Sequence, residues 1–118
     1  MQLKNQILKK NNICTYVETA GTNKLSGSWD WICLSPKEHN PPIKGMYSIA
    51  HELKVVIFTE DDLGWAEGSS RKVNSECKLF LQPEWSRHKK MIPKIVDYVK
   101  RNPKWRISIQ AHKYMGIP

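Results

Sequence analysis

The sequence predicts an α/β fold built on a mostly parallel sheet, and two observations carry this prediction. Short apolar runs alternate along the chain with segments of helical periodicity. Four of the apolar runs end in polar residues of the kind that α/β proteins place at the carboxyl ends of strands. About five strands can be identified, which is few for a closed barrel of eight. The sheet is therefore expected to be open, or to be part of something larger.

Five segments have the length and apolar character of strands. They are residues 13–17, 31–34, 53–58, 78–81 and 105–109. The continuous apolar run Val55–Phe58 favours a strand that is covered on both faces of the sheet. The stretch Glu38–Gly45 contains a pair of prolines and is expected to be a loop.

Helical spacing predicts helices over residues 2–10 and 60–72. A longer helix is indicated by apolar residues three and four apart, namely Met91, Ile92, Ile95, Val96 and Val99. Pro93 falls inside that pattern, so the helix either starts there or kinks. The acidic run Glu60–Asp62 opens the second helix, where N-capping and the helix dipole explain it better than a metal site does.

The composition limits the classes of protein to which this chain can belong. A chain of 118 residues with 40% hydrophobic and 25% charged residues is expected to form one globular domain over residues 1–118. Its longest apolar run falls short of the roughly 20 residues that a membrane helix needs. The amphipathic start lacks the apolar region of a signal peptide. We therefore expect a cytoplasmic protein without a membrane partner.

The net charge of +8 favours anionic partners. This charge is spread along the chain except for the run Arg87–Lys90, which is expected on the solvated face of a helix. No helix-turn-helix, RNA-recognition or zinc-finger signature accompanies the charge. Nucleic acid is therefore not the expected partner, and an RNA-binding protein would have to show steeply salt-dependent binding.

Three cysteines, Cys14, Cys33 and Cys77, are too widely spaced for a CxxC-type metal or cluster site. Each falls inside an apolar strand-like run. The sequence therefore predicts three small buried hydrophobic residues in a reducing compartment.

The strongest functional signal is the set of residues that follow the predicted strands. They are Glu18–Thr22, Ser35–Lys37, Gln82–Glu84 and Gln110–Lys113. In a parallel sheet these groups converge on one crevice, so they predict a ligand site. Gly21 permits close approach of a ligand, Lys37 suits a carboxylate, and Glu84 accepts from an amine or a ribose hydroxyl. The alternative is that these residues serve turns and caps.

Two further side chains are candidates on their chemistry. The unperturbed pKa of a histidine lies near neutrality, so His112 is a candidate general acid or base. The tryptophans are expected to anchor the core, although Trp29 and Trp85 stand beside strand ends and are placed to stack on a ring.

The ordered set of strand-end motifs resembles the C-terminal half of 7-carboxy-7-deazaguanine synthases, which are radical S-adenosylmethionine enzymes of queuosine and deazapurine biosynthesis. The matching segments are Glu18–Thr22, Asp30–Lys37, Glu52–Val56, Leu81–Glu84, Trp105–Lys113 and Gly116–Pro118. The resemblance covers nearly the whole chain after residue 12, and it is the ordered set that is specific.

The resemblance implies a partial (β/α) barrel that converts 6-carboxy-5,6,7,8-tetrahydropterin to 7-carboxy-7-deazaguanine with loss of ammonia. It also implies S-adenosylmethionine, a [4Fe-4S] cluster, Mg²⁺ and a homodimer. The residues implied for S-adenosylmethionine are Gly21, Ser35, Pro36, Lys37, Gln82, Pro83, Glu84 and Trp85. Those implied for the pterin are Thr19, Gln110, His112 and the terminal carboxylate of Pro118.

This sequence departs from the family in one major respect. The family's cluster cysteines and magnesium ligand belong to an N-terminal portion that these 118 residues do not contain, and the three cysteines present cannot replace them. Ala20 and Ala111 also stand where polar residues are expected, and His51 where an acidic residue is common. The chain is therefore expected to be inactive alone. The alternative is a non-catalytic α/β module, derived from this fold, for binding or assembly.

Overall fold

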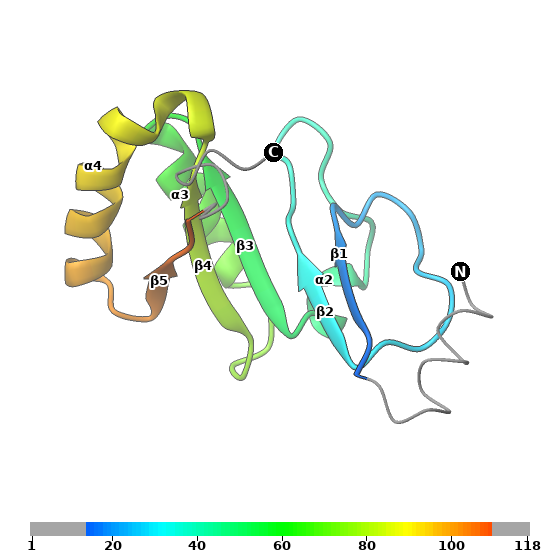
Figure 1. The fold of residues 1–118 in the computed structure, drawn as a ribbon. Helices are drawn as coiled ribbons and strands as arrows, with labels where there is room; N and C mark the ends of the chain where they lie inside the picture. Colours follow the sequence, from blue (N-terminus) through cyan, green and yellow to red (C-terminus); the bar gives the residue numbers. More distant parts are fainter. Residues whose placement is uncertain (1–13, 110–118) are drawn as a thin grey trace.

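The computed structural model describes residues 14–109, and its centre is one five-stranded sheet. The strands are β1 (Tyr16–Thr19), β2 (Trp31–Leu34), β3 (Glu52–Ile57), β4 (Lys78–Pro83) and β5 (Trp105–Ile107). They lie side by side in chain order, and every neighbouring pair is parallel (Figure 1). The predicted α/β fold with parallel strands is confirmed. The sheet does not close in the described part of the chain, as a partial barrel requires.

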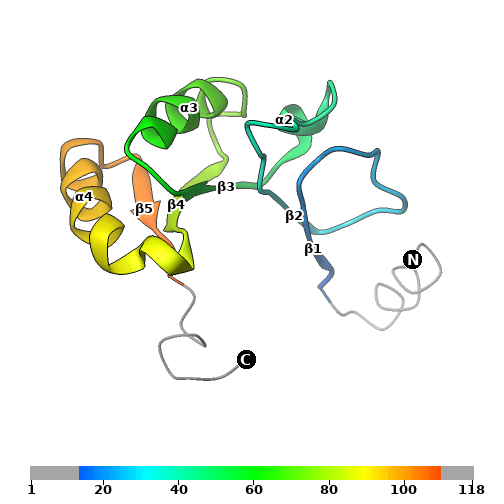
Figure 2. The same ribbon diagram turned by 90° about the horizontal axis from the view of Figure 1, so that it is seen from above.

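The helices of residues 14–109 lie together on one face of this sheet (Figure 2). They are α2 (Met46–Ile49), α3 (Asp61–Ser70), the 3-10 turn η1 (Trp85–Arg87) and α4 (His88–Arg101). The helix expected over residues 2–10 lies outside the described residues. None of the helices in the described range is long and apolar enough to cross a lipid bilayer.

Side-chain alternation along β3 shows how the sheet is covered. Leu53, Val55 and Ile57 are buried, while Glu52, Lys54 and Val56 between them are only partly so. Successive residues of a strand point to opposite faces, so one face packs on the helices and the other carries the polar residues. The expectation of cover on both faces is therefore wrong for the described residues, and Phe58, just past the strand, is 47% exposed.

The hydrophobic core lies between the sheet and its helices. Leu34, Leu53 and Leu81 come from the inner strands and are fully buried. Met91 and Ile95 pack onto them from α4. The remaining buried members of this cluster are Met46, Ala50, Val55, Ile57, Ala66, Cys77 and Trp105. Core packing therefore fixes where each crossover helix lies and, with it, where each strand ends.

Several boundaries differ from those expected from the sequence. β4 runs on to Pro83 because Gln82 and Pro83 pair with Val56 and Ile57 of β3. α2 was not predicted, since a four-residue helix carries no periodicity that a sequence pattern can reveal. α4 begins at His88 and continues past Pro93, so the helix does not start at the proline.

The prediction of buried cysteines is confirmed for two of the three. Cys33 and Cys77 are buried, and burial raises the pKa of the Cys33 thiol to about 12 and that of Cys77 to about 11. Cys14 is exposed, so the expectation of a buried residue is wrong there. It precedes β1 rather than lying within it, and no strand pairing draws it into the core.

His51 joins β2 to β3 at the amino end of the sheet. Its Nδ1 accepts a hydrogen bond from the Ile32 amide at 2.9 Å, and its own amide donates to the Ile32 carbonyl at 2.9 Å. Its ring also stacks on Trp31, with centroids 5.2 Å apart. The imidazole thus replaces one backbone acceptor of the sheet, which gives this position a structural role.

Glu67 joins α3 to the last helix and strand. Its carboxylate accepts from Trp105 Nε1 at 2.7 Å, from Lys104 Nζ at 2.7 Å and from the Tyr98 hydroxyl. Burial raises the pKa of Glu67, but the hydrogen bonds from Lys104, Tyr98 and Trp105 outweigh it and leave the pKa below its ordinary value of 4.5. The ionised form is therefore the one that stabilises the fold.

We expect Glu67→Gln to lower the free energy of unfolding at pH 7 by about 1–3 kcal/mol, because it weakens charge-assisted hydrogen bonds to a largely buried acceptor. The folded pKa is depressed, so this stabilisation is present above pH 4.5 and disappears as the pH falls through the lower folded value. Urea denaturation at neutral and acidic pH measures the difference. Glu76→Gln, at an exposed position, is the matched control. A loss of equal size at both pH values would contradict the assignment.

Candidate functional site

The carboxyl ends of the strands form one edge of the sheet, and the predicted strand-end residues lie along it. Thr19 ends β1, Ser35 follows β2, and Gln82 and Pro83 end β4. Since all five strands run the same way, this edge is where their polar ends meet. Three residues predicted for the pterin, Gln110, His112 and Pro118, lie outside the described residues.

The β1 and β2 ends are tied together by their backbones. The Ser35 amide donates to the Thr19 carbonyl at 2.7 Å, and the Gly21 amide donates to Thr19 Oγ1 at 3.0 Å. The hydroxyl of Thr19 therefore holds the turn that follows β1. These bonds bring together Thr19, Gly21 and Ser35, which sequence reasoning placed on two separate strands.

Gly21 is a glycine for reasons of conformation and packing. Its φ is +76°, in the left-handed region that favours glycine. A Cβ built there would lie 2.8 Å from Leu34 Cδ1 and 2.9 Å from Pro42 Cβ. Its carbonyl also accepts from the Ile43 amide at 2.8 Å. The space that the missing side chain leaves is filled by protein atoms, and contact with a ligand stays a prediction.

Lys37 is partly buried and points its ammonium back at Ser35. Its Nζ donates to Ser35 Oγ at 3.0 Å and to the Ser35 carbonyl at 3.2 Å. Burial lowers the pKa of Lys37, because removing the ammonium from water disfavours its charged form. Lys37 therefore offers a partly desolvated, pre-positioned positive charge to an anionic group.

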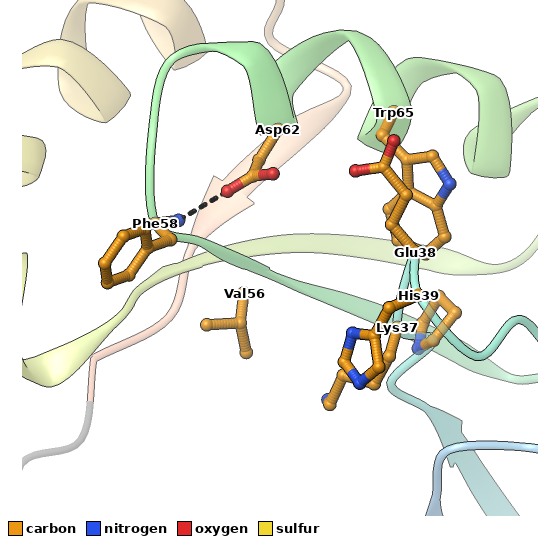
Figure 3. A pocket seen from close by; sticks show the side chains of 8 residues that line it. Lys37, Glu38, His39, Val56, Phe58, Asp62 and Trp65 are labelled. Atoms are coloured by element: carbon orange, nitrogen blue, oxygen red, sulfur yellow. Dashed lines mark hydrogen bonds between the residues drawn. The ribbon is translucent and has the colours of Figure 1, made fainter.

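A pocket of about 440 Å³ lies beside Lys37 at this edge (Figure 3). It is lined by Pro36, Lys37, Glu38, His39, Val56, Phe58, Asp62 and Trp65. β2 and β3 share two paired positions, against six between β3 and β4, and the two strands diverge toward their carboxyl ends (Figure 1). The pocket lies where they diverge, and its volume is in the range of small-molecule sites.

Several pocket residues were not predicted from the sequence. Phe58 and Trp65 supply aromatic surface from β3 and α3, and Asp62 opens the helix between them. The Asp62 carboxylate accepts from the amides of Phe58 at 2.7 Å and Thr59 at 3.0 Å (Figure 3). The acidic run at 60–62 therefore stabilises the entry into α3, as its interpretation as a helix start implies. The apolar run predicts Phe58 as part of the strand, so its place in the pocket is not visible from the sequence.

The β4 end forms a second group of predicted residues. Gln82 is 6% exposed, and its Oε1 accepts from Ser108 Oγ at 3.4 Å. The Glu84 amide donates to the Ile57 carbonyl at 3.0 Å, and its carboxylate accepts from the Ser86 hydroxyl. Trp85 stacks on His88 with ring centroids 4.0 Å apart. Trp85 therefore already has an aromatic neighbour within its own chain.

The two groups are separated by β3. Ser35 follows β2 and Gln82 lies near the end of β4, two strands across the sheet, which at the usual strand spacing is at least about 10 Å. Pro36 and Lys37 line the pocket, whereas the four predicted residues Gln82–Trp85 do not. The edge therefore holds two separate groups of predicted residues, which a ligand must bridge if it is to contact both.

The side chains available at this edge decide which kinds of ligand or prosthetic group can bind there. The Lys37 ammonium, the Ser35 hydroxyl and an aromatic-lined pocket suit a small ligand that carries an anionic group and a ring. An iron–sulfur cluster does not fit, because it needs several thiolates at one place. Cys33 lies within β2 and Cys77 before β4, both as buried thiols. Within residues 14–109 no three His, Cys, Asp or Glu side chains are close enough to hold a metal ion.

Comparison with known proteins bears on this arrangement. No family model matches the chain. A 7-carboxy-7-deazaguanine synthase from Flavobacterium psychrophilum is 50% identical over 118 residues, which are 100% of this chain and 56% of that protein. The chain is similar to the C-terminal half of 7-carboxy-7-deazaguanine synthase. A synthase of the same name from Synechocystis sp. is 41% identical over 110 residues, 93% of this chain and 52% of that protein.

The resemblance to the synthases is thus confirmed, and the chain spans about half the length of the curated relatives it matches. Among solved structures, QueE from Escherichia coli matches with a TM-score of 0.69 and 22% identity, covering 89% of this chain and 48% of that one. At this identity the likeness shows the fold. It agrees with the open parallel sheet described above.

We expect Gly21→Ala to lower the free energy of unfolding by about 1–3 kcal/mol, because the new Cβ meets Leu34 and Pro42 at a positive φ. Gly64→Ala is the matched control, since its Cβ meets nothing within 4 Å in α3, and it is expected to stabilise by about 0.5–1 kcal/mol. Urea denaturation followed by tryptophan fluorescence measures both. A Gly21→Ala protein with wild-type stability would refute the packing explanation.

Proposed function

We propose that this chain is the C-terminal portion of a radical S-adenosylmethionine enzyme of the 7-carboxy-7-deazaguanine synthase type. The reaction would convert 6-carboxy-5,6,7,8-tetrahydropterin to 7-carboxy-7-deazaguanine with loss of ammonia. The chain would supply contacts to the cofactor and the substrate. The observation that carries the proposal is 50% identity with a curated synthase along the whole chain.

The geometry of the carboxyl edge supports a cofactor role. The Ser35 hydroxyl and the Lys37 ammonium lie 3.0 Å apart, and Lys37 lines the pocket. Together they are suited to hold and orient the amino-acid end of S-adenosylmethionine. Gln82 and Glu84 offer amide and carboxylate groups one strand beyond β3, where an adenosine group would find polar partners.

The remaining proposed residues belong either to the cofactor surface or to the pterin site. Gly21, Pro36, Pro83 and Trp85 complete the proposed cofactor surface. Thr19 would contact the pterin through the hydroxyl that now accepts from the Gly21 amide. Gln110, His112 and the Pro118 carboxylate would complete the pterin site, and the assembled enzyme would be a homodimer.

The [4Fe-4S] cluster and Mg²⁺ are proposed to be held by a cluster-binding portion that lies outside these 118 residues. When bound with S-adenosylmethionine, the cluster supplies the electron that cleaves the cofactor. The residues described here bind and orient ligands. The competing function, a non-catalytic module for binding or assembly, is favoured by the absence of a thiolate cluster among the described cysteines.

An NMR titration with S-adenosylmethionine tests the cofactor site. We expect amide shifts confined to Gly21, Lys37 and Gln82, and we expect Lys37→Met to weaken binding about tenfold, since it removes a charge-assisted contact. Lys44→Met, an exposed lysine on the neighbouring loop, is the control and should bind as the wild type does. The absence of shifts at millimolar ligand would rule out a cofactor site in this chain and favour the assembly module.

A second test concerns the chemistry of the isolated chain. After anaerobic iron–sulfur reconstitution, the purified protein is expected to form no 5′-deoxyadenosine from S-adenosylmethionine, because three widely separated thiols, two of them buried, cannot hold a cluster. Chromatography of the products measures this directly. Any 5′-deoxyadenosine above a reductant-only blank would show that the 118 residues carry a functional cluster site.

A further inference from the structure

A second pocket lies at the amino edge of the sheet, opposite the edge that carries the predicted site residues. It is enclosed by the start of β2, the end of α2 and the loop before β4, and its volume of about 460 Å³ is within the range of small-molecule sites. Between the two edges runs β3, whose six residues span roughly 17 Å. No residue of this pocket is among those predicted to bind the cofactor or the pterin. The amino-edge pocket is therefore a separate candidate site.

Two stacked rings form one wall of the amino-edge pocket. Trp31 and His51 both line it, with ring centroids 5.2 Å apart and ring planes 22° from parallel. Trp31 Nε1 donates to Glu52 Oε1 at 2.9 Å, and the amide of Ile32 holds the His51 ring through Nδ1. Ile49, which is 45% exposed, adds aliphatic surface. A flat ligand therefore meets an aromatic wall that is already fixed in place.

Hydrogen-bond donors and acceptors surround this wall. Since His51 Nδ1 already accepts a backbone amide, the neutral imidazole carries its proton on Nε2 and offers a donor there. Asn74 donates through Nδ2 to the Ser48 carbonyl at 2.7 Å, which ties the loop before β4 to α2. Glu76 and Lys78 also line the pocket, and neither side chain makes a hydrogen bond or an ion pair with another residue of the range 14–109. Their charged groups are therefore available to a ligand.

The charges around the pocket favour a neutral ligand that donates hydrogen bonds. Glu76 and Lys78 contribute one charge of each sign. Glu52 adds a second carboxylate, which pairs in register with Lys78 and accepts the indole N–H of Trp31. Two negative charges therefore stand against one positive charge, so an anionic group such as a phosphate is disfavoured. The Glu76 carboxylate instead suits two neighbouring N–H donors, which it accepts side by side.

We propose that the amino-edge pocket binds a guanine-type ring, in which a ring N–H and an exocyclic amino group stand side by side next to a carbonyl. Glu76 accepts the two N–H bonds, and Lys78 and His51 Nε2 offer donors to the carbonyl and the ring nitrogens. The ring itself packs against Trp31. This inference goes beyond the proposed function, because it concerns a different ligand at the opposite edge of the sheet.

Titration of the full 118-residue chain with guanosine, inosine and adenosine, followed by NMR, tests this site. For guanosine we expect shifts of the Trp31 indole N–H and of the amides of His51, Asn74 and Cys77. Inosine lacks the exocyclic amino group and is expected to bind about tenfold more weakly, since one hydrogen bond to a charged acceptor is lost. Adenosine is expected to bind more weakly still, because its ring nitrogen at that edge is an acceptor that the carboxylate repels.

Two variants separate recognition of the ring edge from occupation of the pocket. Glu76→Gln removes a charge at an exposed position, so it is expected to fold normally and to bind guanosine about tenfold more weakly than the wild type. Ile49→Arg fills the pocket and should lower the affinity by at least about tenfold. Ile43→Arg is its matched control, because Ile43 is 40% exposed but lies outside the pocket. This control should bind guanosine as the wild type does.

Each result decides for or against the amino-edge site. Guanosine binding that is weakened in Glu76→Gln and Ile49→Arg but kept in Ile43→Arg establishes it. Equal affinity for the three nucleosides, wild-type affinity in Glu76→Gln, or no shifts at millimolar guanosine overturns it. Guanosine shifts at Gly21 and Lys37 in place of the expected ones also overturn it. None of these results bears on the cofactor role, which the titration with S-adenosylmethionine tests at the other edge.

Discussion

The structure depends on one constraint: five parallel strands in chain order are joined by crossovers that lie on a single face. Handedness of the crossover places each helix on that face, and side-chain alternation then divides the residues. Apolar residues such as Leu53 and Ile57 turn to the helices, while Glu52 and Lys54 turn away. The same parallel direction puts every strand's carboxyl end on one edge, so the position of the site follows from the topology.

Side-chain hydrogen bonds fix the register of these elements at places where apolar packing alone does not determine it. The imidazole of His51 supplies an acceptor for β2 at the amino end of the sheet, and Glu67 gathers donors from Lys104, Tyr98 and Trp105. Both lie away from the carboxyl edge. This division, with structural bonds at one end and the candidate ligand groups at the other, is the usual one for folds of the β/α barrel type.

The sequence was sufficient for the order of the five strands and of the two longer helices, α3 and α4, because apolar runs and helical periodicity are local properties. It also placed Pro36 and Lys37 at the edge where a pocket lies, since a position just after a buried strand determines which edge a residue occupies. It was insufficient wherever the cause is a contact between distant segments. The reason that position 21 is a glycine lies in Leu34 and Pro42, and the partner of Trp85 is a ring on the next helix. The pocket itself depends on how far two strands diverge, which no pattern within one strand records.

The short pairing between β2 and β3 has a consequence for the dynamics of the chain. With two paired positions beside the two hydrogen bonds of His51, this seam has fewer cross-strand contacts to break than the six-position pairing of β3 with β4, so local opening requires less free energy here than there. The segment bearing Thr19 and Ser35 is then able to fluctuate as a unit against the segment bearing Gln82. A molecule that bridged these two groups of residues would hold the seam closed, and its binding affinity would include the free energy of that closure.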